Sequence, residues 1–122
     1  MVKLVAIGAG GFLGAIGRYL IGRLLGKIWR GKFPLGTFVV NMLGCFALGL
    51  LVGKPHFLAT LMDGSVRAAI SVGFMGSFTT FSTFMYESFM LGERGNWSLG
   101  VANIVLSLAA GLFLAWLAIY RF

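Results

Sequence analysis

The sequence predicts an all-α integral membrane protein that crosses the bilayer four times. Only 11% of its 122 residues are charged and 59% are hydrophobic, whereas a soluble domain carries about 25% charged residues. The hydrophobic residues fall into four stretches, each close to the ~20 residues that a helix needs to cross the hydrocarbon core. The apolar character continues to Phe122, so we expect one transmembrane domain over residues 1–122 and no removable signal segment.

Four spans follow one another along the chain with short connections. Three Lys and Arg residues follow the first span, and Pro34 then suits the start of the second, because proline is favoured at the beginning of a helix. Lys54, Pro55 and His56 interrupt the pattern and predict a loop, and residues 91–96 predict a polar loop before the last span. The expected spans cover residues 2–25, 34–52, 66–91 and 97–119.

The basic residues are distributed almost evenly between the two sides of the membrane. The side of the termini carries four, namely Lys3, Lys54, Arg67 and Arg121. The other side carries six, namely Arg18, Arg23, Lys27, Arg30, Lys32 and Arg94. A clear excess of Lys and Arg fixes orientation, so this count leaves two alternatives open. The chain inserts both ways round and forms an antiparallel homodimer, or the basic turn after the first span imposes one topology.

Glycines in the first span are candidates for close helix contact. The pairs Gly10 and Gly14, and Gly22 and Gly26, each have the small-residue spacing that lets membrane helices approach one another. Such pairs are also frequent by chance in a chain with 19 glycines. Spacing alone therefore marks these positions without deciding what they contact.

The third span contains the least typical membrane sequence of the chain. Residues 73–84 combine two glycines, five hydroxyl side chains and four phenylalanines where aliphatic residues are usual. Glycine favours non-helical backbone, and hydroxyls satisfy the backbone groups that a break releases. Irregular backbone at membrane depth is tolerated where it is buried in protein or lines a wet cavity. A broken helix with an ion site and an intact helix packed through small residues both fit this pattern.

Phe81, Phe84 and Asn41 are the candidates for contact with an ion. The two phenylalanines are three residues apart and share a helix face. The positive edge of an aromatic ring favours an anion and its negative face favours a cation, and the spacing does not reveal which of the two faces a pathway. The Asn41 amide, in the middle of the second span, is a donor to an anion or to a neighbouring helix. Spacing alone favours core packing for the two rings. Ser107, in the fourth span, is a weaker candidate for contact with an ion.

Three segments together resemble the CrcB/Fluc family of fluoride channels. They are residues 10–19 (GGFLGAIGRY), residues 34–44 (PLGTFVVNMLG) and residues 79–84 (TTFSTF) followed by Glu87. They occur in the family's order and cover most of the first three spans, whereas the fourth span matches loosely. The resemblance implies a passive fluoride channel that exports cytoplasmic fluoride and so detoxifies it. It also implies an antiparallel dual-topology homodimer with two pores, in a bacterial inner membrane.

The same resemblance implies a role for each matching residue. The fluoride pore would be lined by Asn41, Phe81, Ser82, Thr83, Phe84 and Ser107. The main-chain carbonyls of Gly76 and Thr79 would hold a structural Na⁺ at the dimer interface, and Arg18 would stand in the vestibule. Asn103 falls where a pore-associated residue of the fourth span is expected. The net charge of +7 would draw anions toward the pore and equally suits anionic lipid; no nucleic-acid partner is expected.

A proton-coupled multidrug exporter with four short helices is the alternative function. That chemistry needs a carboxylate inside a span, and the three acidic residues Asp63, Glu87 and Glu93 lie outside the first, second and fourth spans. A purely structural membrane protein would not need the unusual third span. An enzyme is not expected, since the sequence shows no nucleophile–base pair and no metal-ligand cluster.

Overall fold

A computed structural model describes residues 1–122, apart from the side chain of Leu58. Over these residues the chain is helical, and four helical stretches are long and apolar enough to cross a membrane. The elements are α1 (Val2–Ile28), α2 (Leu35–Gly53), α3 (Pro55–Leu61), α4 (Gly64–Ala68), η1 (Ala69–Phe74), α5 (Met75–Phe78), α6 (Phe81–Glu93) and α7 (Trp97–Tyr120). The third span is the stretch from α4 to α6, Gly64–Glu93. The predicted all-α fold with four spans is confirmed.

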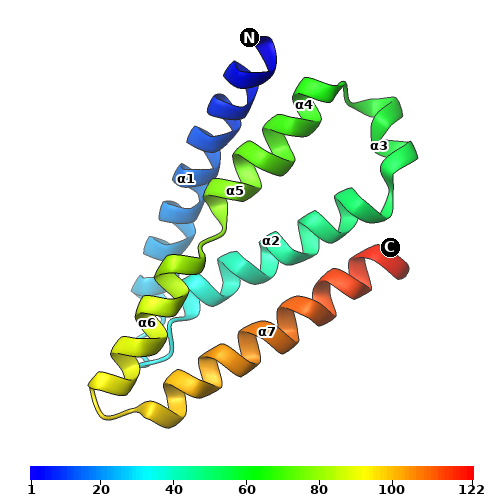
Figure 1. Cartoon of the computed structure of the whole chain (residues 1–122). Helices are drawn as coiled ribbons and strands as arrows, with labels where there is room; N and C mark the ends of the chain where they lie inside the picture. Colours follow the sequence, from blue (N-terminus) through cyan, green and yellow to red (C-terminus); the bar gives the residue numbers. More distant parts are fainter.

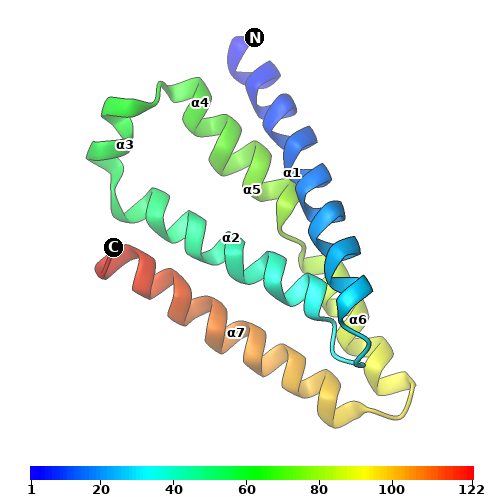
Figure 2. The same ribbon diagram turned by 180° about the vertical axis from the view of Figure 1, so that it is seen from behind.

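The helices form two arms that diverge toward the end of the molecule that carries both termini (Figure 1). One arm pairs α1 with the first half of the third span, and the other pairs α2 with α7 along most of their lengths (Figure 2). The second half of the third span, α6, packs against α7 at the opposite end. The break in the third span therefore lies where the two arms meet.

The connections differ from the predicted loops at both ends of the third span. The chain leaves the helix at Lys54 for a single residue, and Pro55 and His56 begin the short helix α3. The predicted loop is wrong at these two residues because proline in the first turn needs no amide donor and starts a helix well. Asp63 then caps α4, accepting 2.8 Å hydrogen bonds from the Ser65 and Val66 amides.

The loop before the fourth span is shorter than predicted, because α6 continues to Glu93. Gly95 has a φ of 84°, in the left-handed region that glycine enters without strain. The Gly95 amide donates to the Gly92 carbonyl, and the Asn96 amide donates to the Leu91 carbonyl, both at 2.8 Å. This pair of bonds is the Schellman arrangement, which closes a helix tightly.

The third span is broken, which is one of the two alternatives that the sequence left open, but glycine is not what breaks it. Thr79 (φ −81°, ψ 157°) and Thr80 (φ −149°, ψ 118°) are extended between α5 and α6. Gly73 and Gly76 both remain inside helical turns, and the turn before α5 is the π-helix η1. β-branched threonine lowers helix propensity and accepts extended backbone, so the hydroxyl-rich residues, and not the glycines, supply the break.

The glycines instead allow two helices of the chain to pack closely against each other. A Cβ at Gly10 would overlap with the Ala69 carbonyl, and one at Gly14 would overlap with the Phe74 carbonyl. The Gly10–Gly14 pair is thus an interface within the chain, between α1 and η1. Nothing lies within 4 Å of a Cβ built at Gly22 or Gly26, although a Cβ at Gly36 of α2 would come within 3.3 Å of the Gly22 Cα.

Candidate functional site

The broken segment of the third span is held by a side chain from α2. Asn41 stands in the middle of α2 and meets the backbone of Thr80 with both ends of its amide. Its Nδ2 donates to the Thr80 carbonyl at 3.1 Å, and its Oδ1 accepts from the Thr80 amide at 2.9 Å. In the single chain the Asn41 side-chain amide therefore pairs with the backbone N–H and C=O of Thr80, in the way that neighbouring β-strands pair.

The side chain of Thr80 closes the other side of the break. Its Oγ1 accepts a 3.3 Å hydrogen bond from the Thr83 amide and lies 3.0 Å from the Thr83 hydroxyl. Thr80 is therefore the N-cap of α6, a role for which threonine is well suited. Thr79 points its hydroxyl back along α5, donating to the Met75 carbonyl at 2.8 Å. Two threonines thus end one helix and start the next.

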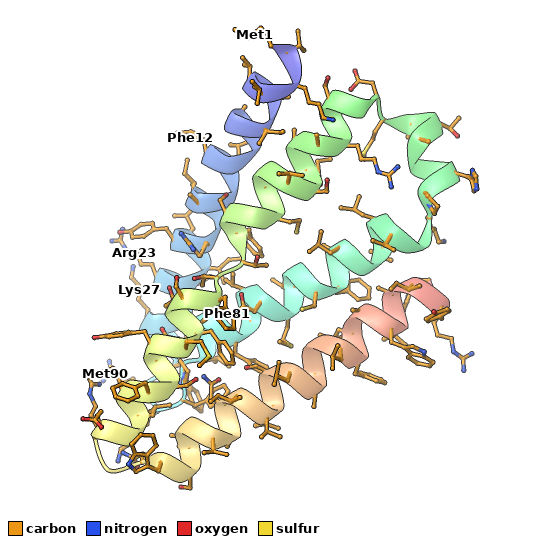
Figure 3. All side chains as sticks on the ribbon, viewed as in Figure 1. Met1, Phe12, Arg23, Lys27, Phe81 and Met90 are labelled. Carbon is orange, nitrogen blue, oxygen red and sulfur yellow. The ribbon has the colours of Figure 1, made fainter. Side chains whose placement is uncertain are left out.

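The two candidate phenylalanines follow the break but have very different surroundings. Phe81 begins α6 (Figure 3) and is 75% exposed, whereas Phe84 is 7% exposed. Their ring centroids are 6.1 Å apart with an angle of 57° between the planes. The shared helix face predicted from their spacing brings the rings together, but it does not bury both in one chain.

A cavity of about 280 Å³ lies beside these rings. Its polar lining comes from α2, the break and α7. The predicted site residues that line it are Asn41, Thr79, Phe81, Phe84 and Ser107. Thr80, Met42, Cys45, Leu48 and Leu108 complete the lining. The fold therefore gathers pore candidates from three separate segments around one space.

A buried polar chain links this cavity to the interface of α6 and α7. The Ser107 hydroxyl donates to Asn103 Oδ1 at 3.4 Å, and Asn103 Nδ2 donates to Ser88 Oγ at 2.8 Å. Ser88 in turn donates to the Phe84 carbonyl at 2.8 Å. Asn103 is 1% exposed, and both ends of its side-chain amide have hydrogen-bond partners within the protein. The sequence provided only a loose alignment for Asn103 and did not identify Ser88, which lies eight residues after Thr80.

A second cavity, of about 290 Å³, lies on the α1 side of the break. Arg18, Thr37 and Thr83 contribute its polar lining, and Thr80 borders both cavities. Arg18 lies on the same helix as Arg23 and Lys27, which stand near the end of α1 (Figure 3). The candidate vestibule residue Arg18 therefore shares a space with the candidate pore hydroxyl Thr83.

Thr37 and Glu87 form a polar pair that the sequence reading did not single out as part of the site. The Thr37 hydroxyl donates to Glu87 Oε1 at 3.0 Å. Within the described structure, the other oxygen, Oε2, is buried and has no hydrogen-bond partner. Both residues also line a neighbouring space that includes Lys32. The sequence signal that could have identified this pair is the Glu87 carboxylate, which lies in an otherwise apolar span.

Four predicted site residues lie outside the 280 Å³ cavity, and two of them, Arg18 and Thr83, line the second cavity instead. Ser82 is exposed and lines neither of the two spaces. Gly76 lies one turn before the break, and nothing lies within 4 Å of a Cβ built there. Among the described side chains, no group of three His, Cys, Asp or Glu residues could hold a metal ion. A cation at this place would have to use main-chain and hydroxyl oxygens.

Comparison with known proteins gives one consistent result. Residues 5–119 match the family described as "CrcB-like protein, Camphor Resistance (CrcB)". The chain is 42% identical over 119 residues to the "Fluoride-specific ion channel FluC" of Nitratidesulfovibrio vulgaris, covering 98% of this chain and 95% of that protein. It is 38% identical over 124 residues to the protein of that name from Hydrogenovibrio crunogenus, covering 98% and 90%. It is 41% identical over 111 residues to "Fluoride-specific ion channel FluC 2" of Moorella thermoacetica, covering 91% and 88%.

Proposed function

The chain belongs to the CrcB-like protein family, and on that premise we propose that it is a fluoride-specific ion channel of a bacterial membrane. The observation that carries this conclusion is identity of about 40% over nearly the whole chain to proteins named fluoride-specific ion channels. The chain is therefore a channel and not an enzyme, and its relatives give no support to the multidrug exporter. Passive export of cytoplasmic fluoride across the inner membrane is the physiological role that we infer.

We propose further that two copies assemble as an antiparallel homodimer of dual topology. The near-even distribution of Lys and Arg between the two ends supports insertion in both orientations. A single chain leaves the Phe81 ring 75% exposed beside the polar break. It also leaves a largely apolar groove of about 490 Å³ between α2 and η1, lined by residues such as Leu50, Ile70 and Met75. A second copy would cover both features, and each chain would contribute to one of two equivalent pores.

The fluoride pathway that we propose passes the 280 Å³ cavity and the exposed face of α6. Fluoride gives up strongly bound water only if the pore replaces it in stages. The positive edges of the Phe81 and Phe84 rings would do part of this. Donors from the Asn41 amide and from the Ser82, Thr83 and Ser107 hydroxyls would supply the rest. Arg18, in the adjoining cavity, would attract anions to the vestibule.

A structural Na⁺ at the break is also proposed, with the Gly76 and Thr79 carbonyls of both subunits as ligands. The donor chemistry fits a small hard cation, which prefers oxygen ligands such as these carbonyls. The space beside Gly76 is open in the single chain, which leaves room for an ion and a second subunit. When bound, the ion would supply positive charge that holds the two broken helices together at the dimer centre.

The test of the function is fluoride efflux from liposomes that contain the purified protein. A fluoride electrode should record rapid release when a fluoride gradient is imposed, and parallel chloride-loaded vesicles should release little chloride. Empty liposomes give the background leak. Equal release of both halides would show a non-selective pore, and release of neither would remove the channel assignment.

A further inference from the structure

Two carbonyls at the break have lost the amides that would pair with them in an unbroken helix. In an α-helix the carbonyl of residue i accepts from the amide of residue i+4. The Gly76 carbonyl would therefore accept from the Thr80 amide, and the Thr79 carbonyl would accept from the Thr83 amide. These are the two carbonyls assigned to the proposed Na⁺ site.

Both amides are engaged elsewhere. The Thr80 amide donates to Asn41 Oδ1 at 2.9 Å, and the Thr83 amide donates to Thr80 Oγ1 at 3.3 Å. Within the described hydrogen bonds, neither carbonyl accepts a backbone amide. An amide oxygen from α2 and a hydroxyl from the break have thus replaced the helical acceptors. The replaced carbonyls keep their lone pairs available for another ligand.

We propose that Asn41 is a positioning residue for the cation site, because it captures the Thr80 amide and thereby keeps the Gly76 carbonyl free. This inference rests on the Na⁺ site proposed above and adds the residue that creates its ligand geometry. This role is distinct from the proposed contact of Asn41 with fluoride, because the two hydrogen bonds to Thr80 fix the backbone of the break. The second N–H of the amide remains free to face the pore.

The way α2 packs explains why Asn41 can hold the break. Val40 and Met42, on either side of Asn41, are 1% and 8% exposed, so the middle of α2 has little freedom to move. One turn later, a Cβ at Gly44 would overlap with the methyl group of Thr79. Two residues of α2 therefore contact two consecutive residues of the break. Because Asn41 contacts Thr80 with an acceptor and a donor together, the extended conformation of Thr80 is favoured over a helical one.

The test compares Asn41→Leu with Asn41→Asp in the full-length protein. Leucine has nearly the shape of asparagine but neither hydrogen-bonding group, so the Thr80 amide is released to the Gly76 carbonyl. Aspartate keeps an acceptor for the Thr80 amide, although its charge would oppose fluoride in the pore. The primary measurement is the rise in melting temperature of the purified protein when NaCl replaces KCl, as a function of Na⁺ concentration. An ion that binds only the folded state raises its stability by RT ln(1 + [Na⁺]/Kd), so the Na⁺ concentration at which the melting temperature begins to rise reports the affinity of the site.

The expected result separates the cation site from the pore. The wild-type protein and Asn41→Asp should both be stabilised by Na⁺, whereas Asn41→Leu should need at least about tenfold more Na⁺ or show no response. Fluoride efflux should fall in both variants, so efflux alone would not reveal the difference. Asn103→Ala is the matched control: it removes another buried amide and lowers the melting temperature, but should leave the Na⁺ response unchanged.

Several results would overturn the inference. An unchanged dependence of the melting temperature on Na⁺ concentration in Asn41→Leu would show that the Gly76 carbonyl does not depend on Asn41. If Asn41→Leu fails to fold, a folded Asn41→Asp without a Na⁺ response would also overturn the inference, because an acceptor for the Thr80 amide would then not be enough to keep the Gly76 carbonyl free. In the wild-type protein, a Thr80 amide that exchanges freely with solvent deuterium would refute the Asn41 bond directly. A wild-type protein without any Na⁺ response would remove the cation site, while the efflux assay would still judge the channel independently.

Discussion

Gly14→Ala tests the contact that holds the first half of the third span in place. The new methyl group would overlap with the Phe74 carbonyl oxygen and with Ser77 Oγ, and would lie 3.0 Å from the Phe74 carbonyl carbon. The side chain of Ser77 can rotate, but the Phe74 carbonyl belongs to the helix backbone and cannot. We therefore expect α1 to move away from η1 and α5.

The expected loss of stability has two parts. Inserting a methyl group into a tightly packed contact costs about 1–3 kcal/mol. Separation of the helices also stretches the hydrogen bond from Ser77 Oγ to the Gly11 carbonyl, which contributes about 1 kcal/mol. The sum is ~2–4 kcal/mol. Gly8→Ala on the same helix is the control, because a Cβ there meets nothing within 4 Å. The gain in helix propensity is the same in both variants and cancels in the difference.

The assay is unfolding of the purified protein in detergent micelles, followed by far-ultraviolet circular dichroism. Gly14→Ala should unfold at a lower denaturant concentration than Gly8→Ala, and its fluoride efflux should decrease because the break depends on the same packing. If the two variants have equal stability, the close approach of α1 to η1 does not contribute to the folded state and the reasoning is wrong.

Three further predictions concern the proposed channel. Replacement of Phe81 or Phe84 by Ile should abolish fluoride efflux while the size-exclusion profile stays that of the wild-type protein, because bulk is kept and the ring edge is lost; full efflux from both variants would leave the rings as packing residues. The swap at buried Phe84 should cost less than about 1.5 kcal/mol of stability, and that at exposed Phe81 still less. Two Lys residues added between α1 and α2 should bias insertion, and C-terminal reporters on the native chain should give signal on both sides of the membrane; signal on one side would exclude dual topology. Thr79→Ser should retain the Na⁺ response, since a main-chain carbonyl is the proposed ligand, and a lost response would point to the side chain.

The four spans could be predicted from the sequence because they depend on local composition, which also marked the third span as a candidate for a break. A hydrophobic stretch of sufficient length has few alternatives to a membrane helix, and the hydroxyl-rich run at residues 77–83 disfavours an uninterrupted one. The N-cap role of Thr80 was not predicted, although threonine before an apolar helical run is a signal for it. The loop prediction was wrong at Pro55, because a proline that follows the end of one helix is also favoured in the first turn of the next helix.

The tertiary structure decided what each unusual residue contacts. Asn41 and Thr80 are 39 positions apart, and only the packing of α2 against the break brings the amide onto that backbone. Gly10 and Gly14 were recognisable as small residues, but their partners in η1 depend on a π-helical turn with no clear local signature. The same packing places Ser107 beside the two rings and leaves Ser82 outside. Local sequence sets which conformations a segment favours, whereas the contacts between segments follow from how whole helices pack, and that packing determines the site.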